Sequence, residues 1–181
     1  NVIITGASKG LGKAGALEAL LKVMKDIGRQ PDELMQKMRY SHEDEQTLMS
    51  QLWSPTVKDD PEAFVLFAFP WGQKNTPLEH FKAPRAWQRR TLRRVAQVIR
   101  DNRGKKSDGE MIDALRRAVS SGRGVGKSAL VSWLIIWMLT TRIGSSVIVS
   151  ANSESQLRKV TWGELTKWVT MAINSHWWEP T

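Results

Sequence analysis

The chain has 181 residues, a formal net charge of +9 and no Cys. The lack of Cys excludes a disulfide framework and a thiolate metal site, and it suits a reducing, intracellular setting. The longest apolar run, residues 129–139, is shorter than the roughly 20 residues needed to cross a bilayer. We therefore expect a soluble protein with one domain and room for an appendage.

The N-terminal end of the chain matches the pattern T-G-x-x-x-G-x-G, which resembles the dinucleotide-binding fingerprint of short-chain dehydrogenases. The glycines of this pattern are Gly6, Gly10 and Gly12. That family also uses a catalytic Tyr followed four positions later by Lys, because the Lys lowers the pKa of the phenol. The only Tyr is Tyr40, and four positions later the chain has Asp44. An NAD(P)-dependent short-chain reductase using these glycines therefore stays an alternative, not the leading hypothesis.

Residues 1–60 are predicted to be mainly helical. Apolar residues recur at helical spacing over residues 11–27. A second helical pattern starts near Pro31 and is interrupted by the polar residues 41–46, so one helix or two short ones fit equally well. Residues 54–61 have the composition of a linker. No role is assigned to this N-terminal segment.

Two further helices are predicted beyond the linker. One is a short buried helix over residues 63–69, because Asp60 is a typical N-cap and Pro61 suits the first helical position. The composition of this segment also fits a strand. Pro84 then opens a long basic helix with an apolar stripe that ends before Gly104.

The positive charge is concentrated in this basic helix and its flanks. Residues 82–106 hold ten Lys and Arg residues against the single acid Asp101, which accounts for the whole net charge. Clustered positive charge is typical of a surface that binds a polyanion. A solvated helix face explains the same pattern equally well. A non-enzymatic DNA-binding module acting through this helix is therefore a further alternative.

The most informative motif is a Gly-rich run that matches the phosphate-binding pattern G-x-x-x-x-G-K-[ST] at every position except the first. In such loops backbone N–H groups turn toward the phosphates, Lys127 reaches the β- and γ-phosphates, and Ser128 ligates Mg²⁺. The predicted nucleotide-contacting residues of the loop are Ser121, Gly122, Arg123, Gly124, Val125, Gly126, Lys127 and Ser128. Nucleotide binding is therefore the leading hypothesis.

The segments around the loop predict an α/β arrangement. Residues 117–120 can form a short strand that leads into the loop, and the nearly all-apolar residues 128–141 fit a helix buried against a sheet. Residues 146–150 are predicted to form a second strand, followed by a helix with a capping box at Ser153 and Gln156. The order strand, helix, strand, helix implies a parallel sheet with a right-handed crossover.

From about residue 60 onward the chain resembles the N-terminal ATPase region of the large terminase subunit of tailed double-stranded DNA bacteriophages. The segments that carry the resemblance are residues 67–72, 84–88, 121–128 and 147–156. Terminases often replace the first Gly of the loop. The resemblance implies an α/β P-loop NTPase domain over residues 61–181, with a parallel sheet and flanking helices, truncated after the second core strand and helix. Residues 1–60 would be an N-terminal helical appendage.

The same resemblance assigns roles to individual residues and implies ATP and Mg²⁺ as cofactors. Trp87 and Gln88 would contact adenine, since an amide can donate to and accept from the base edge. Lys127 would stabilise phosphate charge during hydrolysis, and Ser128 would hold Mg²⁺. Arg123, inside the loop, would act on the γ-phosphate in cis.

The resemblance further implies an ATPase that drives translocation of double-stranded DNA in a packaging motor. The small terminase subunit and the portal protein would be its partners, with a ring oligomer on the portal. It implies a location in the cytoplasm of the infected bacterium and transiently on the procapsid. Members of the family also carry an endonuclease domain and an apolar strand that ends in Asp-Glu, and neither occurs before Thr181. We therefore expect this chain by itself to bind nucleotide weakly and to hydrolyse it poorly.

Overall fold

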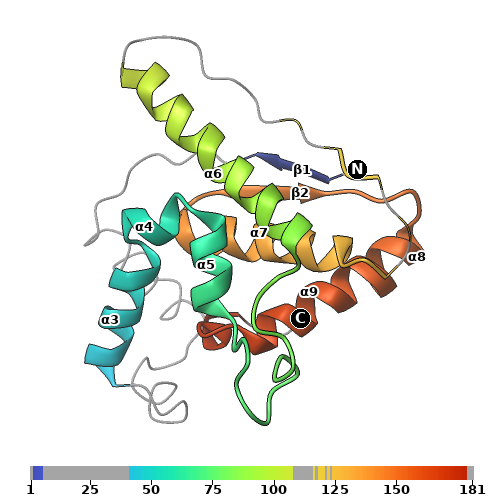
Figure 1. Ribbon diagram of the computed structural model, residues 1–181, viewed down its shortest axis with the longest axis horizontal. Coiled ribbons are helices and arrows are strands. Elements are labelled where there is room, and N and C mark those ends of the chain that lie inside the picture. The colour runs from blue at the N-terminus through green and yellow to red at the C-terminus, as the bar shows by residue number, and fades with distance from the viewer. Residues whose placement is uncertain are drawn as a thin grey trace, which may run out of the picture.

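The computed structural model describes residues 2–5, 41–107, 116, 118–120, 122 and 124–178. Within these residues the chain is mostly helical, and helix α7 runs across the middle of the molecule (Figure 1). No helix in the described part is both long enough and apolar enough to cross a membrane. The elements in chain order are β1 (Val2–Thr5), α3 (His42–Leu52), α4 (Pro55–Lys58), α5 (Pro61–Ala68), α6 (Ala86–Ser107), α7 (Lys127–Thr141), β2 (Ser146–Val149), α8 (Glu154–Gln156), η1 (Leu157–Trp162), α9 (Gly163–Met171) and η2 (Ser175–Trp177).

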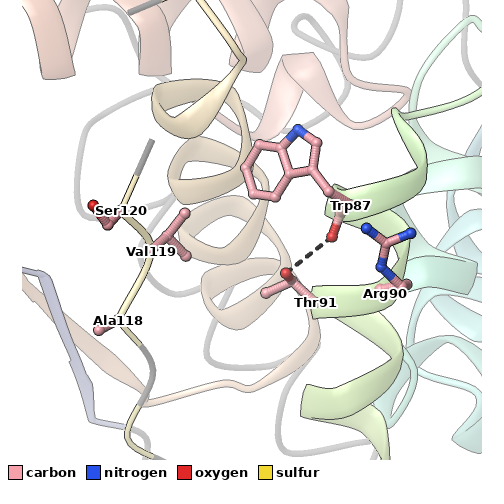
Figure 2. A pocket seen from close by; sticks show the side chains of 6 residues that line it. All are labelled: Trp87, Arg90, Thr91, Ala118, Val119 and Ser120. Carbon is pink, nitrogen blue, oxygen red and sulfur yellow. Dashed lines mark hydrogen bonds between the residues drawn. The ribbon is translucent and has the colours of Figure 1, made fainter. Parts of the chain in front are cut away.

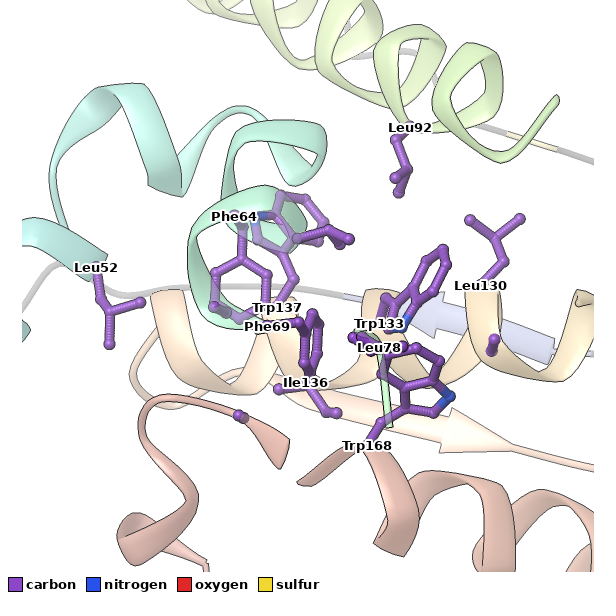
Figure 3. Packing of buried hydrophobic residues seen from close by; sticks show 14 of the residues in the cluster. Leu52, Phe64, Phe69, Leu78, Leu92, Leu130, Trp133, Ile136, Trp137 and Trp168 are labelled. Carbon is purple, nitrogen blue, oxygen red and sulfur yellow. The ribbon is translucent and has the colours of Figure 1, made fainter. Parts of the chain in front are cut away.

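Helix α7 forms the centre of the core, as its nearly all-apolar sequence predicts. It contacts α4, α5, α9 and β2, so most of its circumference is covered. Trp133 and Trp137 on this helix are each only 2% exposed. The ring of Trp168 meets those of Trp133 and Phe69 edge to face, with centroids 4.9 and 5.1 Å apart (Figure 3). The buried helix predicted over residues 128–141 is confirmed.

Helix α5 confirms the helix predicted over residues 63–69 and begins slightly earlier. The Asp60 carboxylate accepts hydrogen bonds from the amides of Glu62 and Ala63, at 2.9 and 3.1 Å. Pro61 occupies the first helical position, where its missing N–H costs nothing. These local contacts fix the start of a helix and explain why the segment is not the strand that its composition also allows.

Helix α6 is longer than its sequence pattern predicts. The pattern ends the helix before Gly104, but α6 continues over 22 residues to Ser107, so this predicted end is wrong. A single internal Gly costs about 1 kcal/mol relative to Ala. The adjacent Arg103 forms an ion pair with Asp59, which anchors this part of the helix against the rest of the molecule. That contact offsets the local preference of Gly104 to end the helix.

The polar residues 41–46 begin α3. The Ser41 hydroxyl accepts a hydrogen bond from the Asp44 amide, while the Asp44 carboxylate accepts one from the Ser41 amide. This capping box starts a new helix at the point where the sequence pattern changes. The segment predicted to be a linker, residues 54–61, contains the short helix α4. The predictions for residues 6–40 lie outside the described residues.

Strand β2 confirms the strand predicted over residues 146–150, but its described partner is β1. The two strands run antiparallel, with Val2 opposite Val149 (Figure 1). The strand predicted over residues 117–120 is not formed at residues 118–120, which have no regular secondary structure. These three residues are exposed, so no neighbouring segment covers them as a sheet would. The parallel sheet implied by the P-loop resemblance stays a prediction.

The helix predicted after β2 is present, but its hydrogen-bond pattern changes from α-helical to π-helical and back along its length. The Ser153 hydroxyl accepts a hydrogen bond from the Gln156 amide at 3.2 Å, which confirms the first half of the predicted capping box. The chain then continues from α8 through the π-helix η1 into α9 without a break. A π-helical segment of this kind departs from the α-helical hydrogen-bond pattern and is rare in proteins.

Candidate nucleotide-binding site

The loop that leads into α7 turns through two glycines with left-handed backbone. Gly124 has a φ of +72° and Gly126 a φ of +90°, a region that residues with a Cβ rarely adopt. Gly126 is the N-cap of α7, and no side chain caps the amides of the first turn. A helix N-terminus of this kind carries partial positive charge and suits an anion. Ser121 and Arg123, two of the predicted nucleotide contacts, lie outside the described residues.

Three consecutive carbonyl groups of the loop face donors at the start of α6. In order, the oxygens of Gly124, Val125 and Gly126 accept hydrogen bonds from Arg85 Nη1 (3.4 Å), Trp87 Nε1 (3.2 Å) and Gln88 Nε2 (2.9 Å). In a trans peptide the carbonyl of one residue and the N–H of the next point in opposite directions. The described residues contain no cis peptide bond. The amides of residues 125–127 therefore point away from these donors, and successive amides turned to one side form a concavity that suits an anion.

Lys127 bends back over the same loop. Its ammonium group donates to the carbonyl oxygen of Gly122 at 2.7 Å, which holds the positive charge beside the backbone turn. A phosphate oxygen is an acceptor that can replace this carbonyl. The Ser128 hydroxyl follows in the first turn of α7 and makes no hydrogen bond within the described part of the chain. These two side chains therefore fit a magnesium triphosphate, with the ammonium for phosphate charge and the hydroxyl for the metal.

Gln88 fixes the loop to α6. Its side chain is 3% exposed, and its Oε1 accepts from the Arg85 amide at 2.9 Å while its Nε2 donates to Gly126. A Cβ added at Gly126 would lie only 2.7 Å from Gln88 Nε2, so the loop before α7 is in close contact with α6. Each end of this amide can make one more hydrogen bond, but the side chain is buried, so the adenine contact implied for Gln88 would require it to move. The structure thus gives this residue a positioning role that sequence reasoning missed.

An open cleft of about 340 Å³ adjoins the loop. It is lined by Trp87, Arg90 and Thr91 from α6 and by Ala118, Val119 and Ser120 from the segment before the loop (Figure 2). The indole N–H of Trp87 bonds to the loop carbonyl of Val125, so one wall of the cleft is attached to the loop itself. The cleft therefore lies directly beside the predicted phosphate-binding turn, with Trp87 in its wall.

The arginines of α6 fall into two groups. Glu62, which is 8% exposed, accepts hydrogen bonds from Arg89 Nε at 2.6 Å and Arg93 Nε at 2.5 Å. Burial raises the pKa of Glu62, but the hydrogen bonds from Arg93 and Arg89 outweigh it, so the pKa lies below its ordinary value. Arg90 and Arg94 are exposed and form no ion pair with any described residue. Only part of the positive charge of α6 is therefore neutralised within the molecule.

Sequence reasoning missed the acids that hold α6 in place. Besides Glu62, these include Asp59, which pairs with Arg103 and lies 3.8 Å from Arg142. Burial lowers the pKa of Arg142, in spite of the attraction of Asp59. The signal in the sequence was a short acidic stretch, residues 59–62, ahead of a strongly basic segment. It indicates attraction between the two segments but not which side chains meet.

Comparison of the chain with protein-family models, with curated proteins and with solved structures gives no match in any of the three. Among the described residues there is no group of three or more His, Asp or Glu side chains that could hold a metal ion. The loop, the adjoining cleft and the arginines of α6 are therefore the features of the described residues that bear on function.

Proposed function

We propose that this chain is the nucleotide-binding part of an ATPase, with the triphosphate held at the N-terminus of α7. The observation that carries the proposal is the direction of three loop carbonyls toward α6, which turns the amides of residues 125–127 to the other side. Backbone amides at a helix N-terminus bind phosphate well because the partial charges of the helix favour an anion there. The left-handed backbone of Gly124 and Gly126 supports the same interpretation.

The side chains around the loop have separate tasks in this proposal. Lys127 exchanges the Gly122 carbonyl for a phosphate oxygen and neutralises negative charge on the transferred group. Ser128 supplies a hydroxyl ligand for Mg²⁺, and the bound metal ion neutralises charge on the phosphates. Gln88 holds the loop in place from α6 and does not touch the nucleotide.

The resemblance to the large terminase subunit extends the proposal from a binding site to a motor. ATP hydrolysis would drive double-stranded DNA into a procapsid, with the small terminase subunit and the portal protein as partners. Arg90 and Arg94, exposed on α6, support a contact with phosphate groups of DNA. Nucleotide binding is the property to measure first, because the loop and the adjoining cleft are the described parts of the proposed site.

The proposal is tested by equilibrium dialysis of the protein with radiolabelled ATP and Mg²⁺. Charge-assisted hydrogen bonds contribute about 1.5–3 kcal/mol, so Lys127→Ala should weaken binding by at least about tenfold. Lys74→Ala is the matched control, because it removes the same charge from an exposed position outside the loop. It should leave the affinity unchanged. Equal binding by the parent and Lys127→Ala would overturn the proposal.

A second candidate function is DNA binding by α6 without any nucleotide. The exposure of Arg90 and Arg94 favours it, since neither arginine is paired with a described acid. This function predicts an affinity for DNA that falls steeply with salt and does not respond to ATP. A DNA affinity that changes when Mg²⁺ and ATP are added would exclude it as the whole function. The reductase alternative depends on Gly6, Gly10 and Gly12, which lie outside the described residues.

A further inference from the structure

The cleft beside the loop is open to solvent and has an aromatic and an aliphatic side chain on opposite sides. The Trp87 indole stands on the α6 side, and the aliphatic side chain of Val119 stands on the other side (Figure 2). The volume of about 340 Å³ is near the lower end of the roughly 300–1,000 Å³ found for small-molecule sites. An aromatic face in such a cleft binds any nucleobase, because every base has a π-face.

The cleft is poor in groups that distinguish adenine. None of its described lining residues has a side-chain amide or a side-chain carboxylate. The Gln88 amide, which the resemblance assigns to adenine, is buried and bonded to Arg85 and Gly126. The Thr91 hydroxyl donates its hydrogen to the Trp87 carbonyl at 3.0 Å. The polar side-chain groups that remain are the Ser120 hydroxyl and the guanidinium of Arg90, and the guanidinium has five donors and no acceptor.

Arginine matches one purine better than the other. Guanine presents two adjacent acceptors, N7 and O6, which an Arg guanidinium can bind with two hydrogen bonds. Adenine presents one acceptor and an amino donor at the same edge, and a guanidinium cannot accept from the amino group. The hydroxyls of Thr91 and Ser120 can accept one hydrogen bond, which is weaker than a charged pair. The described lining of the cleft therefore favours guanine over adenine.

We infer that this cleft holds the base of the nucleotide by stacking on Trp87 and contacts its edge only through Arg90, so that GTP binds at least as tightly as ATP. The inference rests on the proposed function, since it requires the triphosphate to lie at the N-terminus of α7. It departs from the resemblance, which implies adenine recognition by Gln88. Gln88 is then a positioning residue, and the substrate class is purine nucleoside triphosphates rather than ATP alone.

Equilibrium dialysis with labelled GTP, ATP and inorganic tripolyphosphate, each with Mg²⁺, separates the base from the phosphates. The parent should bind GTP at least as tightly as ATP. Base stacking on an aromatic side chain is worth about 1–3 kcal/mol, so Trp87→Ala should weaken both nucleotides about tenfold or more. Trp87→Phe keeps a stacking face and removes the indole N–H that bonds to Val125. It should retain most of the nucleotide affinity, which separates stacking from support of the loop.

The role of Arg90 is tested against its neighbour one turn along α6. Arg90→Met should lower the affinity for GTP several-fold and change that for ATP by less than twofold. Arg94→Met, which removes the same charge but does not line the cleft, should change neither. Tripolyphosphate binding should survive Trp87→Phe and fall in Lys127→Ala.

The outcomes distinguish this inference from the proposed function. Tripolyphosphate binding that depends on Lys127, combined with tighter binding of ATP than of GTP, overturns the inference and leaves the phosphate site standing. A loss of tripolyphosphate binding in Trp87→Phe equal to the loss of nucleotide binding also overturns it. No saturable binding of any of the three ligands overturns both.

Discussion

The middle of helix α7 and its N-terminus are held in different ways. In the middle, Trp133 and Trp137 lie in an apolar core formed with α5 and α9. At the N-terminus, the loop carbonyls of residues 124–126 are held by hydrogen bonds from the start of α6. Apolar burial has no preferred direction, whereas hydrogen bonds fix the orientation of individual groups. The core therefore sets where α7 lies, and α6 sets which way the loop amides face.

The position of the loop consequently depends on what holds α6. Glu62 of α5 binds Arg89 and Arg93, and Asp59 binds Arg103 further along the helix. These acids lie on the segment that leads into and forms α5, whose apolar side chains belong to the core. A chain of contacts thus runs from the core through α5 and α6 to the loop. Changes in the core should alter global stability, and changes near the loop should alter ligand affinity first.

The largest expected effect is on stability, from Trp133→Ala. Trp133 is 2% exposed, and its N–H has no hydrogen-bond partner within the described part of the chain, so its contribution is packing. Replacing a buried Trp by Ala lowers the free energy of unfolding by about 3–5 kcal/mol, measured by urea denaturation. Trp162→Ala is the control, because Trp162 is 51% exposed and should change this energy by less than about 0.5 kcal/mol. Similar losses from both variants would mean that packing of Trp133 in the core contributes no more stability than an exposed Trp does.

The second prediction concerns the two loop glycines. Both have left-handed backbone, so an Ala at either position is strained by about 1–2 kcal/mol. At Gly124 the new Cβ meets open space, whereas at Gly126 it lies 2.7 Å from Gln88 Nε2. Gly126→Ala should therefore weaken tripolyphosphate binding at least tenfold, and clearly more than Gly124→Ala does. Dialysis measures the affinity, and urea denaturation should show both variants less stable than the parent by roughly the 1–2 kcal/mol of backbone strain.

A double variant isolates the contact with α6. Gln88→Ala by itself should weaken binding, because its amide holds the loop. Added to Gly126→Ala, it should cost less affinity than in the parent, because it also removes the atom that the new Cβ would meet. Added to Gly124→Ala, it should cost as much affinity as in the parent, because nothing lies near the Cβ at that position. Equal effects of the two glycine substitutions would mean that backbone strain alone is being measured.

The parts of the fold that sequence reasoning predicted are those that local chemistry decides. The Asp60 cap with Pro61 determines where α5 begins, and the apolar circumference of residues 128–141 predicts a buried helix. The predicted end at Gly104 is wrong because a distant ion pair outweighs the local preference of Gly. The strand predicted at residues 117–120 is not formed at residues 118–120, because a strand needs a neighbour that no local pattern can supply.

The candidate site divides in the same way. The positions of Gly126, Lys127 and Ser128 relative to one another follow from their spacing, so the motif predicts that they lie together at a helix N-terminus. The contact of Gln88 with Gly126 joins residues 38 positions apart, and that of Glu62 with Arg93 joins residues 31 positions apart. Such contacts depend on how α5, α6 and α7 pack, which periodicity and spacing do not encode.

The smallest expected effect tests the link between α5 and α6 through pH. The hydrogen bonds from Arg93 and Arg89 outweigh the burial of Glu62 and hold its pKa below the ordinary value of a Glu carboxyl. A carboxyl whose pKa is lower in the folded state contributes stability above its unfolded pKa and loses it as pH falls through the folded value. The arginines are partly exposed, at 37% and 57%, so the contribution of Glu62 is about 1 kcal/mol. Urea denaturation should show Glu62→Gln less stable than the parent by this amount at neutral pH, with the difference shrinking below a pH of about 4.5.

Glu154→Gln removes a carboxylate whose ion pair with Arg158 is almost fully exposed, so it should have little effect at any pH. A difference between the parent and Glu62→Gln that persists unchanged to a pH of about 3 would mean that the charge of Glu62 does not hold α6 to α5.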